Sequence, residues 1–166
     1  MKKQIWISGI FILLVLIAGC TQEDPDENLL QFNQTFLGNY VPEFTESRLL
    51  KKSDLPPDQQ RMFDESEARL QILVDLNQNT IPDYVISGVC ESCVKAEEKM
   101  PFYIAIFERQ ETGIVRQFFQ RVYVPPVNFQ QSNERGFPSV VISFAFASDY
   151  GAEIYFQDNE YHLEIW

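Results

Sequence analysis

Residues 102–124, FYIAIFERQETGIVRQFFQRVYV, decide the fold expected of this chain. Phe102–Phe107 and Ile114–Val124 are runs of apolar and β-favouring residues, and Gln110–Gly113 between them has the composition of a turn. Two such runs joined by a short turn form an antiparallel hairpin. The sequence therefore predicts strands linked by turns, and not the helical crossovers that a parallel sheet requires.

Further strands are expected on both sides of this hairpin, because apolar residues either alternate with polar ones or run on between turn signals. These segments are residues 68–76, 81–87, 137–148, 152–157 and 161–166. The apolar run within 137–148 is nearly continuous, which favours a central strand of a sheet.

Helices are expected only near the N-terminal side. Residues 29–37 carry apolar side chains at helical spacing, and residues 53–67 contain a capped, proline-initiated helix start. Residues 130–136 are a predicted polar loop. The sequence thus predicts an α+β fold: one β-rich domain of mostly antiparallel strands and hairpins, with one or two short N-terminal helices.

The first 20 residues have a different character. Lys2 and Lys3 precede an apolar run, Ile5–Ile17, that is shorter than the roughly 20 residues of a membrane-spanning helix, so we expect a leader that is removed. The sequence Ile17-Ala18-Gly19-Cys20 at its end resembles the lipobox of bacterial lipoproteins. That resemblance implies cleavage before Cys20 and acylation of Cys20, palmitate included, which anchors the chain in a lipid bilayer.

This resemblance sets the expected organisation of the chain. Residues 1–19 are the leader, residues 20–28 are the lipidated cysteine and an acidic tether, and residues 29–166 are the globular domain. The expected location is the cell envelope. If there are two membranes, Thr21 after the lipidated cysteine, where Asp would favour retention at the inner membrane, implies the outer membrane, facing the periplasm or the surface.

The charge of the mature chain limits its partners. The leader holds two of the 13 basic side chains and none of the 24 acidic ones, so the remaining 147 residues have a formal charge of −13. Nucleic acid and anionic lipid headgroups attract clusters of Lys and Arg, which this surface lacks. We therefore expect no nucleic-acid binding, and membrane attachment only through lipid.

The two remaining cysteines, Cys90 and Cys93, are expected to form a disulfide, because an exported chain meets an oxidising environment. Haem attachment would need His at position 94, which is Val94, and a zinc site would need two further ligands. A thiol-redox role stays open as an alternative.

One loop has the spacing of a cation site. Oxygen donors recur at alternate positions after residue 74: the side chains of Asp75, Asn77 and Asn79, the carbonyl of Ile81 and the carboxylate of Asp83. A short loop wraps a hard cation such as calcium in this manner. The loop resembles the calcium loop of FG-GAP and related bacterial β-propeller-type repeats, which implies bound Ca²⁺ at these five residues.

The loop also departs from that family pattern. The usual glycine at the sixth place is Thr80, and the twelfth place is Ile86, so it is not an EF-hand. Asp and Asn side chains also cap turns without any metal, so a metal-free rigid hairpin is the alternative. A complete propeller would need more strands than this chain supplies.

No catalytic signature is evident. The carboxylates are expected to be solvated surface, and these are Glu91, Glu97, Glu98, Glu108 and Glu111. The single histidine, His162, is expected to be a partly exposed strand residue.

We therefore expect a non-enzymatic binding or structural module of the envelope, whose partner is another envelope protein or a glycan. With 14 Phe, seven Tyr and two Trp, an exposed aromatic patch would mark the partner site. The alternatives are calcium-dependent adhesion or assembly, and a hydrolase or thiol-redox enzyme.

Overall fold

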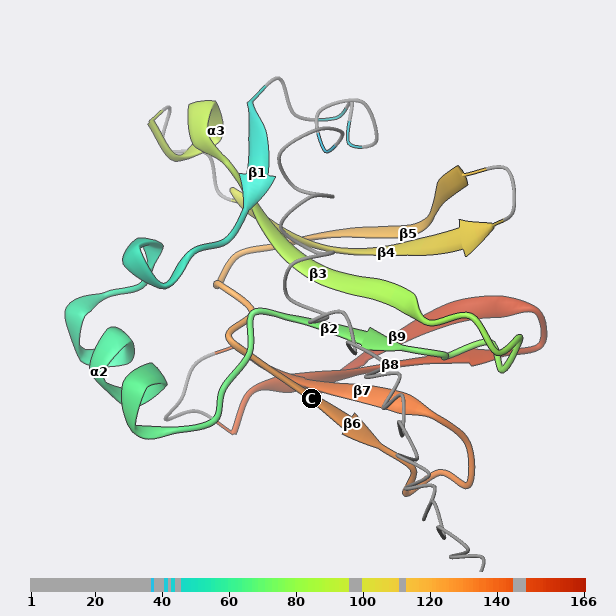
Figure 1. Ribbon diagram of the computed structural model, residues 1–166. Coiled ribbons are helices and arrows are strands. Elements are labelled where there is room, and N and C mark those ends of the chain that lie inside the picture. The colour runs from blue at the N-terminus through green and yellow to red at the C-terminus, as the bar shows by residue number, and fades with distance from the viewer. Residues whose placement is uncertain are drawn as a thin grey trace, which may run out of the picture.

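The computed structural model describes residues 37, 41, 43, 46–95, 100–110, 113–144 and 149–166. They form two antiparallel sheets that lie one above the other (Figure 1). The first sheet contains β1 (Ser47–Leu49), β2 (Gln71–Val74), β3 (Asp83–Cys90), β4 (Phe102–Gln110) and β5 (Gly113–Val122). The second contains β6 (Asn128–Ser132), β7 (Ser139–Ser143), β8 (Gly151–Gln157) and β9 (Glu160–Ile165). The predicted β-rich, antiparallel α+β class is confirmed.

Strand β3 organises the first sheet, because it pairs with three other strands. Its last three residues pair with β1, its first four pair with β2, and β4 occupies its other edge. The predicted hairpin of residues 102–124 is confirmed as β4 and β5, with a register shift between Ile106 and Phe107. Strand β5 forms the free edge of this sheet.

The second sheet is a meander in the order β6-β7-β8-β9. Strand β7, which comes from the apolar run 137–148, has a neighbour on each side, as predicted. The amide of Phe129 on β6 donates to the carbonyl of Arg69, just before β2, at 3.0 Å. This bond joins neighbouring edges of the two sheets.

The main core lies between the sheets. Successive side chains of a strand point to opposite faces of its sheet, so alternate residues enter this core. Strands β3 and β4 direct Val85, Ile104 and Ile106 toward the second sheet, which contributes Ile142 and Ile154 among others. The opposite faces of β3 and β4 are buried too, in a cluster that Leu37 and Val41 help to cover. Burial on both faces explains why the sequences of β3 and β4 are so continuously apolar.

Within residues 46–95, three short helical segments accompany the sheets: η1 (Lys52–Asp54), α2 (Pro57–Glu65) and α3 (Glu91–Lys95). Helix α2 confirms the helix predicted within residues 53–67, and Pro57 stands in its first turn as expected. The helix predicted over 29–37 lies outside the described residues except for Leu37, which is helical and buried. The described residues contain no helix that is both long enough and apolar enough to cross a membrane.

Strands β1 and β6 and helix α3 were not predicted. Strand β6 covers part of the expected polar loop 130–136, so that prediction was wrong for residues 130–132. The strand forms because buried Phe129 anchors it to the core and its backbone pairs with β7, while Gln130 and Gln131 face solvent. The expected leader, the lipidation site Cys20 and the tether lie outside the described residues.

Candidate functional site

The predicted cation loop connects β2 to β3 at one end of the sandwich, and the side chains of Asp75, Asn77 and Asn79 accept hydrogen bonds from its backbone amides. Asp75 accepts hydrogen bonds from the amides of Asn79 (3.0 Å) and Thr80 (2.8 Å). Asn77 Oδ1 accepts from the same Asn79 amide at 3.1 Å, and Asn79 Oδ1 accepts from the Ile81 amide at 2.8 Å. The loop thus folds around its own backbone donors, as Asp and Asn do in turns.

The backbone of this loop is bent tightly at two residues. Gln78 has a φ of 58° and Thr80 a φ of 74°, both in the left-handed region. Thr80 stands where the calcium-loop pattern has glycine, and it adopts this conformation despite its branched side chain. Such a conformation costs a non-glycine residue roughly 1 to 2 kcal/mol, which the surrounding hydrogen bonds offset.

Asp83, the last side chain of the predicted set, lies against the backbone amide of Leu76 and does not accept from the amides of residues 79–81. It begins β3 and is completely buried. Its Oδ2 accepts from the hydroxyl of Tyr161 at 3.2 Å, whereas Oδ1 is buried without a hydrogen-bond partner among the described residues. Burial raises the pKa of Asp83 to about 7, and the negative charges of Glu108 and Asp75 act in the same direction.

Glu108 on β4 and Tyr161 on β9 complete this cluster. The Tyr161 hydroxyl is 3.0 Å from Glu108 Oε1, and the amide group of Asn77 donates to the same oxygen at 2.5 Å. Gln117 and Gln110 donate to Glu108 Oε2 at 2.8 and 3.2 Å. Although partial burial alone would raise the pKa of Glu108, these four donors together lower it.

The sequence pattern did not predict this role of Glu108. The residue was expected to be solvated surface, and it is instead partly buried and fully hydrogen-bonded. Its partners Asn77 and Tyr161 are 31 and 53 residues away along the chain. No local pattern signals such a contact, because it depends on the pairing of whole strands.

A groove of about 510 Å³ opens beside the cluster, and we call it the acidic groove. Its lining residues are acidic, amide or aromatic: Glu108, Gln117, Phe156, Asn159, Glu160 and Tyr161. Figure 1 shows why they meet: the β2–β3 loop and the β8–β9 turn lie at the same end of the sandwich. Among the described residues, no group of three His, Cys, Asp or Glu side chains is placed to hold a metal ion. Calcium binding by the loop therefore stays a prediction.

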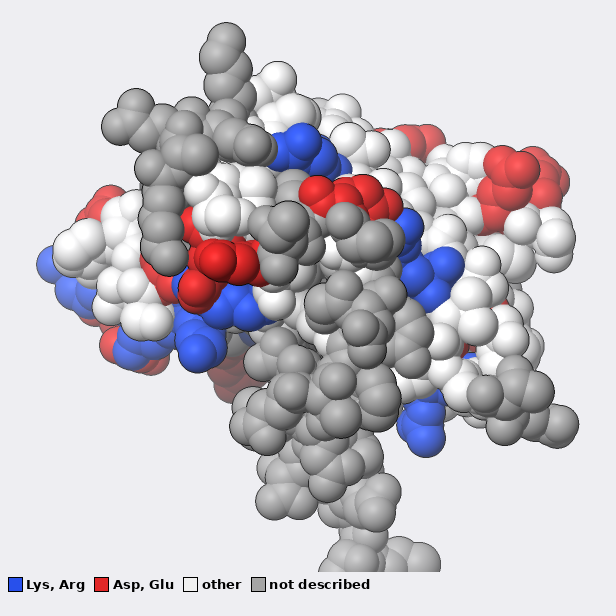
Figure 2. Space-filling view, turned by 90° about the horizontal axis from the view of Figure 1, so that it is seen from above, with Lys and Arg blue, Asp and Glu red and all other residues white. Residues whose placement is uncertain are grey.

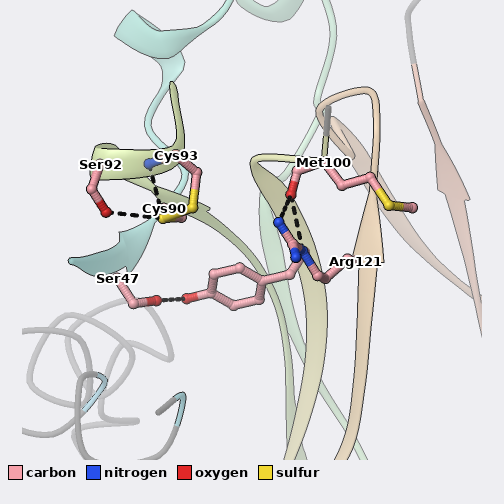
Figure 3. Close-up of a disulfide and its surroundings, with 7 residues drawn as sticks. Ser47, Cys90, Ser92, Cys93, Met100 and Arg121 are labelled. Carbon is pink, nitrogen blue, oxygen red and sulfur yellow. Dashed lines mark hydrogen bonds between the residues drawn. A yellow bond between two sulfur atoms is a disulfide. The ribbon is translucent and has the colours of Figure 1, made fainter. Parts of the chain in front are cut away.

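The opposite end of β3 carries the predicted disulfide between Cys90 and Cys93 (Figure 3). Both cysteines are buried, at the junction where β3 passes into α3. The amide of Cys93 donates to Cys90 Sγ at 3.1 Å, and the Ser92 hydroxyl donates to the same sulfur at 3.3 Å. The bond packs within the cluster that covers the outer face of the first sheet.

Tyr103 belongs to the same buried cluster as this disulfide and lies opposite Gly88 of β3. Its hydroxyl forms a 2.6 Å hydrogen bond with Ser47 Oγ (Figure 3). A Cβ atom at Gly88 would lie only 2.0 Å from the Tyr103 ring. Position 88 therefore requires glycine, because the ring crosses directly over the β3 backbone.

The expected exposed aromatic residues gather at this same end. Seven large hydrophobic side chains are exposed among the described residues, and Tyr123, Tyr150, Ile165 and Trp166 are four of them. The first three line one groove of about 330 Å³, which we call the aromatic groove. Trp166 adjoins it, because its backbone exchanges two hydrogen bonds with Gly151.

His162 lies on β9, as expected of a strand residue, and stacks on Tyr155 with ring centroids 5.2 Å apart. Its Nε2 is 3.1 Å from the carbonyl of Gln157.

Comparison of the whole chain with models of protein families, with curated proteins and with solved structures found no match.

Proposed function

We propose that this chain is a lipid-anchored cell-envelope lipoprotein whose β-sandwich is a non-enzymatic binding module. The anchoring part rests on the lipobox-like sequence that ends at Cys20. A closed Cys90–Cys93 bond suits the oxidising environment that exported chains meet. The binding part rests on one observation: four of the seven exposed large hydrophobic side chains among the described residues line or adjoin the aromatic groove.

The aromatic groove has the properties of a docking site. Tyr123 is 63% exposed and Tyr150, which packs against Phe144, is 48% exposed. Tyrosine side chains supply a large contact area at a low entropic cost, and their flat faces suit apolar surfaces and sugar rings alike. The groove would therefore bind another component of the envelope, either a protein or a glycan.

The anchor can be tested by metabolic labelling with an alkyne analogue of palmitate in the bacterium. The wild-type chain should incorporate the label and fractionate with membranes. A Cys20→Ser variant should do neither. A Cys20→Ser chain that still acquires the label would contradict the anchoring proposal.

The groove can be tested by photocrosslinking in intact cells, with the crosslinking residue at position 123 or at position 115. Val115 is the matched control, since it is exposed on β5, the strand that ends just before Tyr123, but lies outside the groove. We expect a reproducible adduct only from position 123. Protease or muramidase digestion of the adduct distinguishes a protein from a glycan, and equal adducts from both positions would contradict the proposal.

A second function, calcium-dependent assembly, is favoured by the wrapped conformation of the loop. Asp75 and Asn77 already direct oxygens to one point, the amide of Asn79. A weakly bound ion would stabilise the fold at millimolar calcium by on the order of 1 to 2 kcal/mol. Thermal melts with and without 10 mM calcium decide this, with Asp75→Asn as the control, and an unchanged melting temperature would rule it out.

A further inference from the structure

We propose that the Cys90–Cys93 disulfide is a redox switch that controls the attachment of β1. While the bond is closed, residues 90–93 hold β1 against β3. When a dithiol reduces the bond, β1 is released and the rest of the sandwich stays folded. Helix α3, which contains Cys93, and strand β1 lie side by side at one corner of the molecule (Figure 1).

Strand β1 is held weakly by its own pairing. Three residue pairs join it to β3, and within residues 47–49 only the side chain of Leu49 is buried. Strand β2 makes four pairs along the same edge of β3 and buries both Ile72 and Val74. Burial of apolar side chains is the main source of stability, so β1 depends more than β2 on contacts outside its strand pairing.

The disulfide loop supplies such contacts. Cys90 pairs with Ser47, the first residue of β1, and the amide of Glu91 donates to the carbonyl of Glu46 at 2.9 Å. The carboxylate of Glu91 forms an ion pair with Arg48, the central residue of β1. Residues 46–48 are thus each contacted by Cys90 or Glu91.

The disulfide keeps Glu91 in the position that these contacts require. Helix α3 has only five residues, and a helix shorter than about 12 residues is marginal without other constraints. The bond closes this turn, and the amide of Cys93 reinforces it by donating to Cys90 Sγ at 3.1 Å. Opening the bond would therefore free Glu91 and remove its contacts with Glu46 and Arg48.

Arg48 also has a partner outside the disulfide loop. Its guanidinium donates to both carboxylate oxygens of Asp54 in η1, at 2.6 and 2.7 Å. Figure 2, which views the molecule from above, shows acidic and basic side chains beside one another on the left, where η1 and α2 lie in Figure 1. Asp54 is only six residues from Arg48, so this pair ties β1 to η1 and not to β3. The pair with Glu91 is the one that connects β1 to the disulfide loop.

The switch is opened by thiol–disulfide exchange. Both cysteines are buried, but Ser92 between them is partly exposed and Val94 beside them is exposed, so a small movement of α3 admits a thiol. A dithiol reductant attacks one sulfur, and its second thiol then resolves the mixed disulfide. Two electrons and two protons pass to Cys90 and Cys93, which become thiols, and the reductant leaves as a disulfide.

The test is an NMR measurement on the full-length protein, first oxidised and then treated with dithiothreitol. The cross-strand Overhauser contact between Arg48 and Val89 reports on β1, and the contact between Ile72 and Val85 reports on β2. We expect reduction to abolish the first contact and to leave the second. Oxidation with glutathione disulfide should restore the first.

Variants separate the bond from the ion pair. Cys90→Ser combined with Cys93→Ser should lose the β1 contact without any reductant; if this variant does not fold, reduction of the folded wild type decides. Glu91→Gln keeps the disulfide but removes the ion pair, so amide exchange at residue 91 should rise about two- to fivefold. Glu65→Gln is the matched control, since it removes an exposed pair with Arg61 on α2 and should leave that exchange unchanged.

Three results would overturn the inference. The β1 contact could survive reduction, which would mean that the disulfide does not hold this strand. Both contacts could vanish together, which would make the bond a stabiliser of the whole fold. Equal exchange at residue 91 in Glu91→Gln and Glu65→Gln would show that Glu91 does not connect the bond to β1.

Discussion

The same two strands, β3 and β9, reach both ends of the sandwich and present opposite chemistry there. At one end they carry Asp83 and Tyr161, which join Glu108 in a buried polar cluster. At the other end they carry Cys90, closed into a disulfide, and Ile165, in the aromatic groove. The shared framework makes each end rigid, while the residues at the strand termini decide whether that end attracts charge or apolar surface.

A substitution in β3 should have the largest effect on stability, because this strand connects the two ends of the sandwich. Gly88→Ala places a methyl group against the Tyr103 ring and should destabilise the fold by about 3 kcal/mol. Urea unfolding followed by Trp166 fluorescence reports on the aromatic end, and amide exchange of residues 75–83 reports on the acidic end. Both should lose protection together; loss at one end alone would show that the ends are independent.

The disulfide should matter at one end only. Replacing Cys90 and Cys93 with alanine frees a short loop and should lower stability by about 2 kcal/mol. The loss of stability should be the same at pH 5 and pH 8, since neither cysteine lies near the cluster of Asp83, Glu108 and Tyr161. A reductant added to the wild-type protein is the control, and a loss that depends on pH would contradict this separation of the ends.

Asp83 should make the acidic end sensitive to pH. Its folded pKa is raised to about 7, so between about pH 4 and pH 7 the folded chain holds a proton that the unfolded chain has released. This contribution to stability is complete below about pH 4 and is lost progressively as the pH rises from there through 7. Asp83→Asn removes the dependence, and above pH 7 it should be more stable than wild type by on the order of 2 kcal/mol after allowance for solvent screening.

Urea unfolding of both proteins at pH 5 and pH 8 measures this effect. The difference between them should already be present at pH 5, since the loss begins above about pH 4, and it should reach its full size at pH 8. A variant that is less stable than wild type at pH 8 would show that the ionised carboxylate, not its neutral isostere, is what the cluster requires.

The smallest change is expected in the loop itself. Thr80→Gly relieves the left-handed backbone but increases the freedom of the unfolded chain, so a net gain of about 0.5 to 1 kcal/mol is expected. Gly136, which already has a φ of 83°, supplies the control: Gly136→Ala should lose a similar amount. A thermal melt measures both, and a destabilised Thr80→Gly variant would mean that the threonine side chain stabilises the loop.

The local sequence pattern was enough to predict structural features that form between residues close together in the chain. The hairpin of residues 102–124, the disulfide and the oxygen-rich loop all follow from residues that are close in sequence. The cluster of Asp83, Glu108 and Tyr161 could not be predicted, because it requires the register of β3 on β4 and the packing of β9 from the other sheet. Strand β6 was not predicted, because Gln130 and Gln131 are polar residues typical of a loop and only Phe129 anchors the strand to the core.

The double pairing of β3 also has a mechanical consequence. A chain held by lipid at Cys20 would be pulled from its N-terminal side, and the first of the described strands to meet that load is β1. Only three residue pairs join β1 to β3, whereas β2 keeps its own four pairs further along the same edge. Under tension β1 would therefore detach first and lengthen the tether, while β2 keeps its own pairing with β3.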